Sequence, residues 1–371
     1  MDRTGFEVVQ DKNHSRNTQH FFSLHRILIL TLFTISTVFL NVSSLNAQDV
    51  ERLFVSSFNG GEVLEYDATT GSFVSVFVGF GSGGVDNPSG LMFGPDDNLY
   101  VASRTTDEVI RYNGQTGAFI DVFVTAGSGG LDAPWGIIFG PDDNLYVSSR
   151  RSDEVIRYDG GTGEFIDIFV TEASGGLAAP RGLVFGSDDN LYVSSSDTDE
   201  VLRYNGASGA FIDAFVTEGS GGVDSPRGLV FGSDNNLYVS SSSNDQVIRY
   251  NGTTGAFINV FVTAASGGLD SPRGLIFGPD NNLYVCSFDS DQVIRYNGQT
   301  GAFIDVFVNT GSGGLEDPKF LVFFNESQRS RSGSCSLAPD NSIIEMSALF
   351  GLLGYLLIPA VMLVRRRVGR K

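Results

Sequence analysis

The stretch Pro226–Val262, PRGLVFGSDNNLYVSSSSNDQVIRYNGTTGAFINVFV, contains four short runs rich in Val, Ile, Phe and Tyr. The runs are Gly228–Phe231, Asn236–Ser240, Gln246–Tyr250 and Ala256–Val262, and clusters of Gly, Asn, Asp and Ser between them favour turns. No part of the stretch has a sustained helical period. The last run is apolar on both sides, as expected of a sheet that packs on both faces. The stretch therefore predicts a four-stranded antiparallel sheet.

This unit recurs every 46 residues. Its opening proline stands at Pro88, Pro134, Pro180, Pro226, Pro272 and Pro318, and the Tyr of its second run at Tyr100, Tyr146, Tyr192, Tyr238 and Tyr284. Four-stranded units of about 40–50 residues are typical of propeller blades, because one unit cannot bury its own apolar surface.

The two ends of the repeat array complement each other. The first unit begins at Leu53–Ser57, which matches a second strand, and the last unit ends with Pro318–Phe324, which matches a first strand. Pairing these partial units would complete one blade, close the ring and remove exposed sheet edges. We expect an all-β, six-bladed β-propeller over residues 48–324; an open β-solenoid is the alternative.

The amino end has the pattern of a secretory signal. The apolar run Ile27–Leu40 follows a polar stretch that ends in His25-Arg26, and Ala47 is a candidate cleavage site. Residues 1–47 are therefore expected to be a signal peptide with a long leading region. An uncleaved anchor is the alternative.

The carboxyl end has three parts: a polar spacer over 325–342 with Gly333-Ser334-Cys335, an apolar run from Ser347 to Val364, and a basic tail. About 18 apolar residues can span a bilayer, so a transmembrane helix with a cytoplasmic tail is expected within 343–371. The arrangement resembles the PEP-CTERM-like sorting tags of bacterial surface proteins, in the variant with a Gly/Ser-Cys motif. The resemblance implies a sorting protease or transpeptidase as partner and places Cys335 near a processing or lipid-attachment point. The alternative is a simple membrane anchor with an incidental Cys; in both cases the propeller would lie on the extracytoplasmic face of a bacterial membrane or at the cell surface.

Composition limits the chemistry. Residues 48–324 contain 13 Lys and Arg against 37 Asp and Glu, and so acidic a body repels nucleic acid. The three histidines, His14, His20 and His25, all precede the expected cleavage site. A mature chain without histidine has no Ser-His-Asp or Cys-His machinery and no His metal ligand.

The segments Pro88–Val101 and Pro272–Val285 share the sequence motif Pro-x-Gly-Leu-x-Phe-Gly-Pro-Asp-x-Asn-Leu-Tyr-Val. This motif resembles the repeats of NHL-type and streptogramin-lyase-like six-bladed propellers. The resemblance implies the propeller fold, and it makes a metal-dependent lyase or lactonase of the streptogramin-lyase or gluconolactonase type the alternative function. Lyases of that type use a histidine base, which the expected mature chain lacks.

Two sets of acidic loops recur with the repeat. One set follows the first strand, as in Asp188-Asp189-Asn190, and the other precedes the third strand, as in Asp107-Glu108 and Asp153-Glu154. Asp and Asn favour tight turns, which is the structural interpretation. Surface Ca²⁺ or Mg²⁺ is the alternative, although one or two carboxylates per loop do not complete a Ca²⁺ shell. No cofactor is otherwise expected.

The residue after each opening proline varies between repeats, and it is basic in four of the six. First strands line a propeller axis, so these residues are expected to surround one mouth of the channel: Ser89, Trp135, Arg181, Arg227, Arg273 and Lys319. Gathered cations beside the only Trp predict an anion or glycan contact site. The alternative is that each Arg pairs with a neighbouring carboxylate such as Asp224 or Asp270. A further periodic arginine, such as Arg203 or Arg249, is expected to form a blade-to-blade ion pair.

These observations favour a non-enzymatic binding module for a protein or glycan partner. The lyase or lactonase is the second hypothesis, and a self-assembling surface-layer protein is the third.

Overall fold

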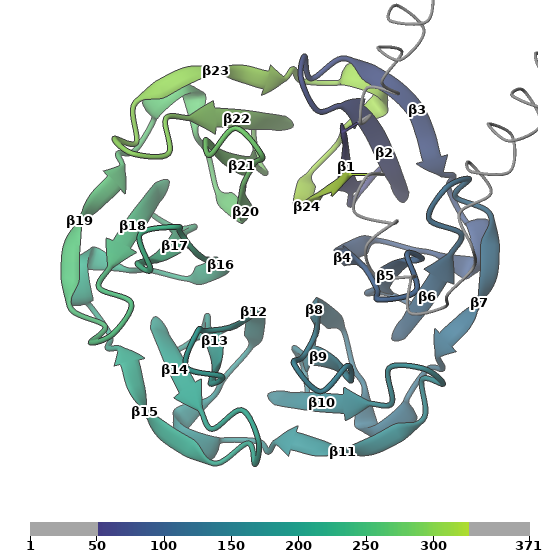
Figure 1. The fold of residues 1–371 in the computed structure, drawn as a ribbon, viewed down its shortest axis with the longest axis horizontal. Coiled ribbons are helices and arrows are strands. Elements are labelled where there is room, and N and C mark those ends of the chain that lie inside the picture. Colours follow the sequence, from purple (N-terminus) through teal and green to yellow (C-terminus); the bar gives the residue numbers. More distant parts are fainter. Residues whose placement is uncertain (1–50, 326–371) are drawn as a thin grey trace, which may run out of the picture. The chain divides into compact units, whose positions relative to one another are not determined.

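The computed structural model describes residues 51–325, which form six four-stranded antiparallel sheets around a central axis (Figure 1). The inner strands are β4 (Pro88–Phe93), β8 (Pro134–Phe139), β12 (Pro180–Phe185), β16 (Pro226–Phe231), β20 (Pro272–Phe277) and β24 (Pro318–Asn325). The second strands are β1 (Glu51–Ser57), β5 (Leu99–Ser103), β9 (Leu145–Ser149), β13 (Leu191–Ser195), β17 (Leu237–Ser241) and β21 (Leu283–Ser287).

The third strands are β2 (Glu62–Asp67), β6 (Glu108–Tyr112), β10 (Glu154–Tyr158), β14 (Glu200–Tyr204), β18 (Gln246–Tyr250) and β22 (Gln292–Tyr296). The outer strands are β3 (Phe73–Val78), β7 (Phe119–Val124), β11 (Phe165–Val170), β15 (Phe211–Val216), β19 (Phe257–Val262) and β23 (Phe303–Val308). Short 3₁₀ turns follow the outer strands: η1 (Ser82–Gly84), η2 (Ser128–Gly130), η3 (Ser174–Gly176), η4 (Ser220–Gly222), η5 (Ser266–Gly268) and η6 (Ser312–Gly314). The predicted six-bladed propeller is confirmed, with strand ends that differ from the sequence expectation by one or two residues.

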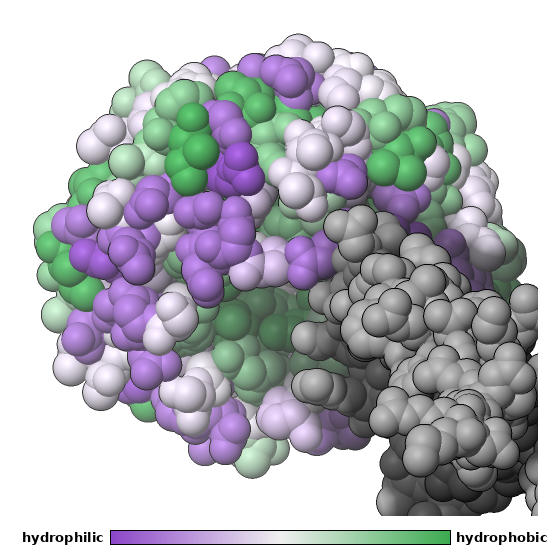
Figure 2. Space-filling model, turned by 45° about the horizontal axis from the view of Figure 1, so that its top comes forward, coloured by the Kyte–Doolittle hydropathy of each residue, from purple (hydrophilic) through white to green (hydrophobic). Residues whose placement is uncertain are grey.

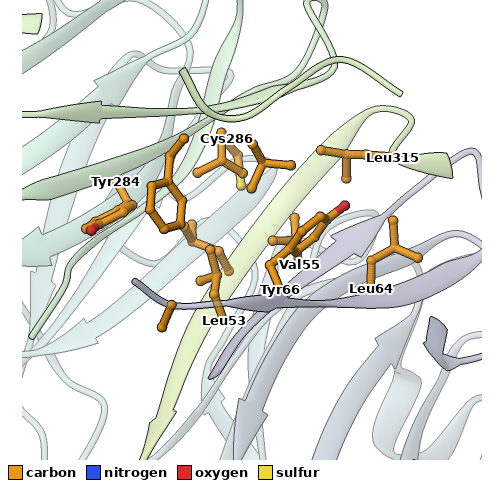
Figure 3. Close-up of a cluster of buried hydrophobic side chains, with 12 residues drawn as sticks. Leu53, Val55, Leu64, Tyr66, Tyr284, Cys286 and Leu315 are labelled. Carbon is orange, nitrogen blue, oxygen red and sulfur yellow. The ribbon is translucent and has the colours of Figure 1, made fainter. Parts of the chain in front are cut away.

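The ring closes as the sequence predicts. β24 pairs with β1, with Leu321 opposite Val55 and Phe323 opposite Leu53, and β1–β3 complete that blade. Figure 3 shows the apolar seam where this blade meets the last complete one: Leu53, Val55 and Tyr66 lie against side chains that include Tyr284 and Cys286. The thiol of Cys286 is fully buried in this seam, as expected of a structural cysteine.

Aromatic side chains join each blade to the next. Tyr192 in β13 is buried and makes edge contacts with Phe215 of its own blade and with Phe231 of the following blade, at ring-centroid distances of 4.8 and 5.1 Å. Such a pair contributes about 0.5–1.5 kcal/mol beyond its area burial. Because the 46-residue period repeats this arrangement around the ring, every blade packs on both faces.

The outer strands expose a belt of apolar side chains at the circumference of the disc. The Phe that begins each outer strand is 40–46% exposed, and a partly exposed Ile or Val follows it. Figure 2 shows apolar patches between hydrophilic residues at the edge of the disc. The covered part of the Phe119 ring packs on Gly83 of η1, where an added Cβ would lie 2.1 Å from a ring carbon. This contact ties the outer strand to the turn that leaves the preceding blade.

The expected signal peptide with its cleavage site at Ala47, the spacer with Cys335 and the apolar run within 343–371 lie outside the described residues. Within residues 51–325 no helix has the length and apolar character needed to cross a bilayer.

Candidate functional site: the axial mouth of the propeller

A bulge at the start of each inner strand positions the residue after the proline. In β12, Pro180 pairs with Ser195 and Leu183 with Val193, so three steps on the inner strand face two on its partner. The extra residue falls at Arg181-Gly182. Bulges redirect side chains and are frequent beside functional sites.

Glycine after this residue lets neighbouring inner strands approach closely. A Cβ built on Gly136 would lie 2.3 Å from the carbonyl oxygen of Arg181, and one on Gly182 would lie 2.3 Å from that of Arg227. Real side chains do not fit at that distance. The inner strands are therefore held together around the axis, which concentrates the neighbouring side chains.

The carboxylates that precede the third strands hold the mouth in shape. Asp107 accepts a hydrogen bond of 2.6 Å from the amide of Ala133 in the next blade, and Asp153 does the same for Ala179. Ala133 and Ala179 stand just before the opening prolines in the left-handed region, with φ of 54° and 48°. The same bond recurs at Asp199, Asp245 and Asp291. These carboxylates therefore link neighbouring blades. Within residues 51–325, no group of three or more acidic, His or Cys side chains is placed to hold a metal ion.

The other acidic set forms turns, as the structural interpretation expects. Asp188 accepts hydrogen bonds from the backbone and side chain of Asn190 and from the hydroxyl of Tyr192. Burial acts to raise the pKa of Asp188, but these hydrogen bonds together outweigh it and hold that pKa below its ordinary value.

Trp135 is the centre of the mouth. Its side chain is 3% exposed, and cations from other blades lie over its ring: Arg181 at 4.1 Å, Lys319 at 4.3 Å, Arg104 at 5.4 Å and Arg227 at 5.9 Å from the ring centroid. Cation–π contacts of this kind contribute about 0.5–2 kcal/mol each. The ring therefore brings together side chains from five blades.

Lys319 is the most enclosed basic side chain of the mouth. It is 2% exposed, and its Nζ atom lies over the rings of Phe58, Trp135 and Phe288. Burial and the nearby arginines lower the pKa of Lys319 to about 4, against only a weak opposing effect of Asp317. Arg273 stacks on Phe288 at 4.4 Å and donates to Ser242, while Arg181 donates to Ser196.

Ser89 has a structural role in the same ring. It is fully buried, and its hydroxyl contacts the carbonyl oxygens of Ala102 and Pro134, at 3.3 and 2.8 Å. In other blades a second-strand serine makes the corresponding link, as Ser148 does to the carbonyl of Arg181. Ser89 thus replaces the hydroxyl that Ala102 cannot supply.

A second ring of residues lies at the same mouth and was not predicted from the sequence. The position directly after each second strand also recurs every 46 residues, and it holds Phe58, Arg104, Arg150, Ser196, Ser242 and Phe288. Five of these residues contact the first ring: Arg104 lies over Trp135, Phe58 lies beneath Lys319, Phe288 stacks with Arg273, and Ser196 and Ser242 accept hydrogen bonds from Arg181 and Arg273. The charge of Arg150 acts on Arg181 and Arg227 and lowers their pKa values. The signal was available, since this position varies between cation, aromatic and serine as the first ring does. We call Phe58, Arg104, Trp135, Arg150, Arg181, Arg227, Arg273, Phe288 and Lys319 the axial cluster.

The axial cluster is short of acceptors. Five buried side-chain nitrogen atoms of the cluster have no hydrogen-bond partner within residues 51–325: Nε of Arg104, Arg150, Arg227 and Arg273, and Nε1 of Trp135. Each unsatisfied buried donor costs about 1–3 kcal/mol. Burial and neighbouring arginines also lower the pKa values of Arg104, Arg181 and Arg227.

The expected pairing of these arginines with Asp224 or Asp270 is wrong. Within the described chain no carboxylate lies at ion-pair distance from Arg181, Arg227, Arg273 or Lys319. Asp224 and Asp270 bond instead through their backbone to the serine that ends the adjacent second strand. The third-strand arginines do form ion pairs, but inside one blade: Arg203 contacts Asp213 at 2.6 Å and Asp188 at 3.7 Å, which corrects the expected blade-to-blade geometry.

Solved structures resemble this fold. The crystal structure of a nidogen/laminin complex contains a chain that matches with a TM-score of 0.61 and 15% identity, over 74% of this chain and 98% of the other. Virginiamycin B lyase from Staphylococcus aureus matches with a TM-score of 0.48 and 14% identity, over 68% of this chain and 83% of the lyase. No protein-family model and no curated protein matches the sequence. At such low identity the likeness of the nidogen/laminin chain supports the β-propeller fold alone.

Proposed function

We propose that this protein is a non-enzymatic binding module, which holds an anionic group of a protein or glycan partner at the axial mouth. One observation carries the proposal: the axial cluster gathers five arginines and Lys319, and all of these except Arg150 lie over one of three aromatic rings. Within residues 51–325 no carboxylate lies at ion-pair distance from any of the six side chains. Charged groups removed from water without a counter-ion destabilise a fold, so an arrangement of this kind is best explained by a ligand that supplies the charge.

The aromatic rings suit a partner with an apolar or sugar face beside its anionic group. Trp and Phe offer flat contact area, and Arg offers a planar fork that matches carboxylate, sulfate or phosphate. A location outside the cytoplasm is part of the proposal, and it depends on the expected signal peptide and carboxyl-terminal tag. The nidogen/laminin match is compatible with a protein partner through its fold.

Binding to immobilised acidic glycans and acidic proteins tests the proposal with a triple variant, Arg181→Ala/Arg227→Ala/Arg273→Ala. The matched control is Arg157→Ala/Arg203→Ala/Arg295→Ala, which removes the same charge from arginines that have carboxylate partners. We expect the first variant to lose binding at least tenfold and the control to keep it. Equal binding by both variants and the wild type would remove the axial mouth as the site.

A further inference from the structure

The axial cluster holds more positive charge than one monovalent anion neutralises. Its cations are Arg104, Arg150, Arg181, Arg227, Arg273 and Lys319. Three carboxylates, Asp197, Asp289 and Asp317, act on the pKa values of this group from beyond ion-pair distance. The five arginines against these three carboxylates leave a net charge of about +2 while Lys319 is neutral, and about +3 once a bound anion favours protonation of Lys319.

The charge is also concentrated in a small volume. Groups from four other blades lie within 5.9 Å of the ring centroid of Trp135. The body around the mouth is strongly acidic, with 37 Asp and Glu against 13 Lys and Arg over residues 48–324. Such a surface repels a long polyanion that would run past the mouth, whereas a compact anion meets mainly the cluster.

The donors of the cluster need several acceptors. Four guanidinium Nε atoms and the Nε1 atom of Trp135 are buried without a partner, and Trp135 itself is 3% exposed. One carboxylate has two oxygens, so a single group cannot satisfy five donors that come from four blades.

We propose that the ligand is a compact polyvalent oxyanion, with three or more carboxylate, phosphate or sulfate groups close together, bound over Trp135. This inference rests on the proposed function and specifies its ligand. The same chemistry is found in a free small molecule and in a densely charged terminal unit of a glycan, and the test separates the two sources.

The protein carries its own reporter, because Trp135 is the only tryptophan of the chain. Fluorescence excited at 295 nm is recorded on the full chain at pH 8 and constant ionic strength during titration with acetate, succinate, tricarballylate and butane-1,2,3,4-tetracarboxylate. These probes differ in the number of carboxylates. We expect the dissociation constant to fall about tenfold for each added carboxylate up to three, as charge-assisted hydrogen bonds are added.

A second arm compares tripolyphosphate, a trisulfated disaccharide and a long heparin chain. Tighter binding of tripolyphosphate indicates a free small molecule, and tighter binding of the disaccharide indicates a glycan end; both support the inference. Heparin that binds more tightly per chain end than either compact probe overturns it.

The variant Arg227→Gln/Arg273→Gln should weaken tetracarboxylate binding at least about 30-fold, because it removes two of the charges that contact the ligand. Both side chains are partly exposed, so they can be replaced without emptying the core. The control Arg157→Gln/Arg203→Gln should bind as the wild type does, with thermal melting used to show that both variants are folded. A tetracarboxylate that binds no more tightly than succinate overturns the inference and leaves the proposed function standing. No response to any anion, by fluorescence or by calorimetry, overturns both.

Discussion

Replacing Lys319 with methionine should make the empty protein more stable at pH 7, although it removes a buried side chain. Methionine has a similar length and no charge, so it can fill the space between Phe58, Trp135 and Phe288 without desolvating an ammonium group. Residues that serve ligand binding commonly lower stability, and Lys319 would be an example.

The magnitude follows from the pKa of Lys319. The pKa falls from 10.5 in the ordinary case to about 4 in the fold, so the amine is neutral at pH 7. At pH 7, which is 3.5 pH units below the ordinary pKa, removing the proton from lysine costs about 5 kcal/mol. This cost is an upper bound for the stability that the protein gains when Lys319 is replaced. Imperfect packing of the methionine side chain in the same space costs up to about 1.5 kcal/mol and reduces the gain. We therefore expect Lys319→Met to raise the free energy of unfolding by at least about 2 kcal/mol.

The pH dependence has a defined sign. Between pH 4 and 10.5 the unfolded chain holds the proton that folded Lys319 has released, so the stability of the wild type increases with pH in this window. The variant lacks this contribution, and its advantage should shrink as the pH rises from 7 to 10. Urea unfolding at both pH values measures the difference, with Arg203→Met as a control that breaks the ion pair with Asp213 and should destabilise. A less stable Lys319→Met variant, or an advantage that does not change up to pH 10, would refute this reasoning.

Further predictions concern the scaffold and the coupling of protons to binding. Gly182→Ala should destabilise the protein by more than about 2 kcal/mol in chemical denaturation, because its Cβ would meet the carbonyl oxygen of Arg227. The control Gly79→Ala has open space around its Cβ and should change the stability by less than about 0.5 kcal/mol. Asp153→Ala should lower the free energy of unfolding by about 1–3 kcal/mol, since it leaves the amide of Ala179 without its acceptor. Asp153→Asn keeps an acceptor oxygen and should lower the free energy of unfolding less. An equal decrease for both variants would contradict the role of Asp153 in linking the blades. Binding of a permanently ionised anion such as sulfate should raise the pKa of Lys319, so that the complex takes up a proton. The affinity should therefore increase from pH 8 to pH 5, and the calorimetric heat of binding should depend on the buffer. A heat of binding that does not depend on the buffer would exclude this coupling.

The ring and its closure were predictable because they depend on local, repeated signals. Turn residues mark the strand ends in every unit, and the half-blades at Leu53–Ser57 and Pro318–Phe324 have complementary missing parts. The position of the residue after the proline was predictable for the same reason, since first strands line the axis of any propeller.

Contacts between residues far apart in sequence were not predictable from the repeat. The bulge at Arg181-Gly182 depends on the register between β12 and β13, which the apolar pattern does not fix. Asp153 was interpreted as a turn residue or a metal ligand, because its acceptor role depends on an amide 26 residues away in the next blade. The ring that contains Phe58 and Arg104 was missed because these residues begin a loop, where polar turn chemistry was expected.

A crystal of the full chain soaked in selenate tests the central claim most directly, because anomalous scattering from selenium locates each bound oxyanion without assumptions about the ligand. We predict a strong peak at the axial mouth, within hydrogen-bond distance of the guanidinium groups of Arg227 and Arg273 and of Nε1 of Trp135. Peaks only beside the paired third-strand arginines, with none at the mouth, would contradict the account.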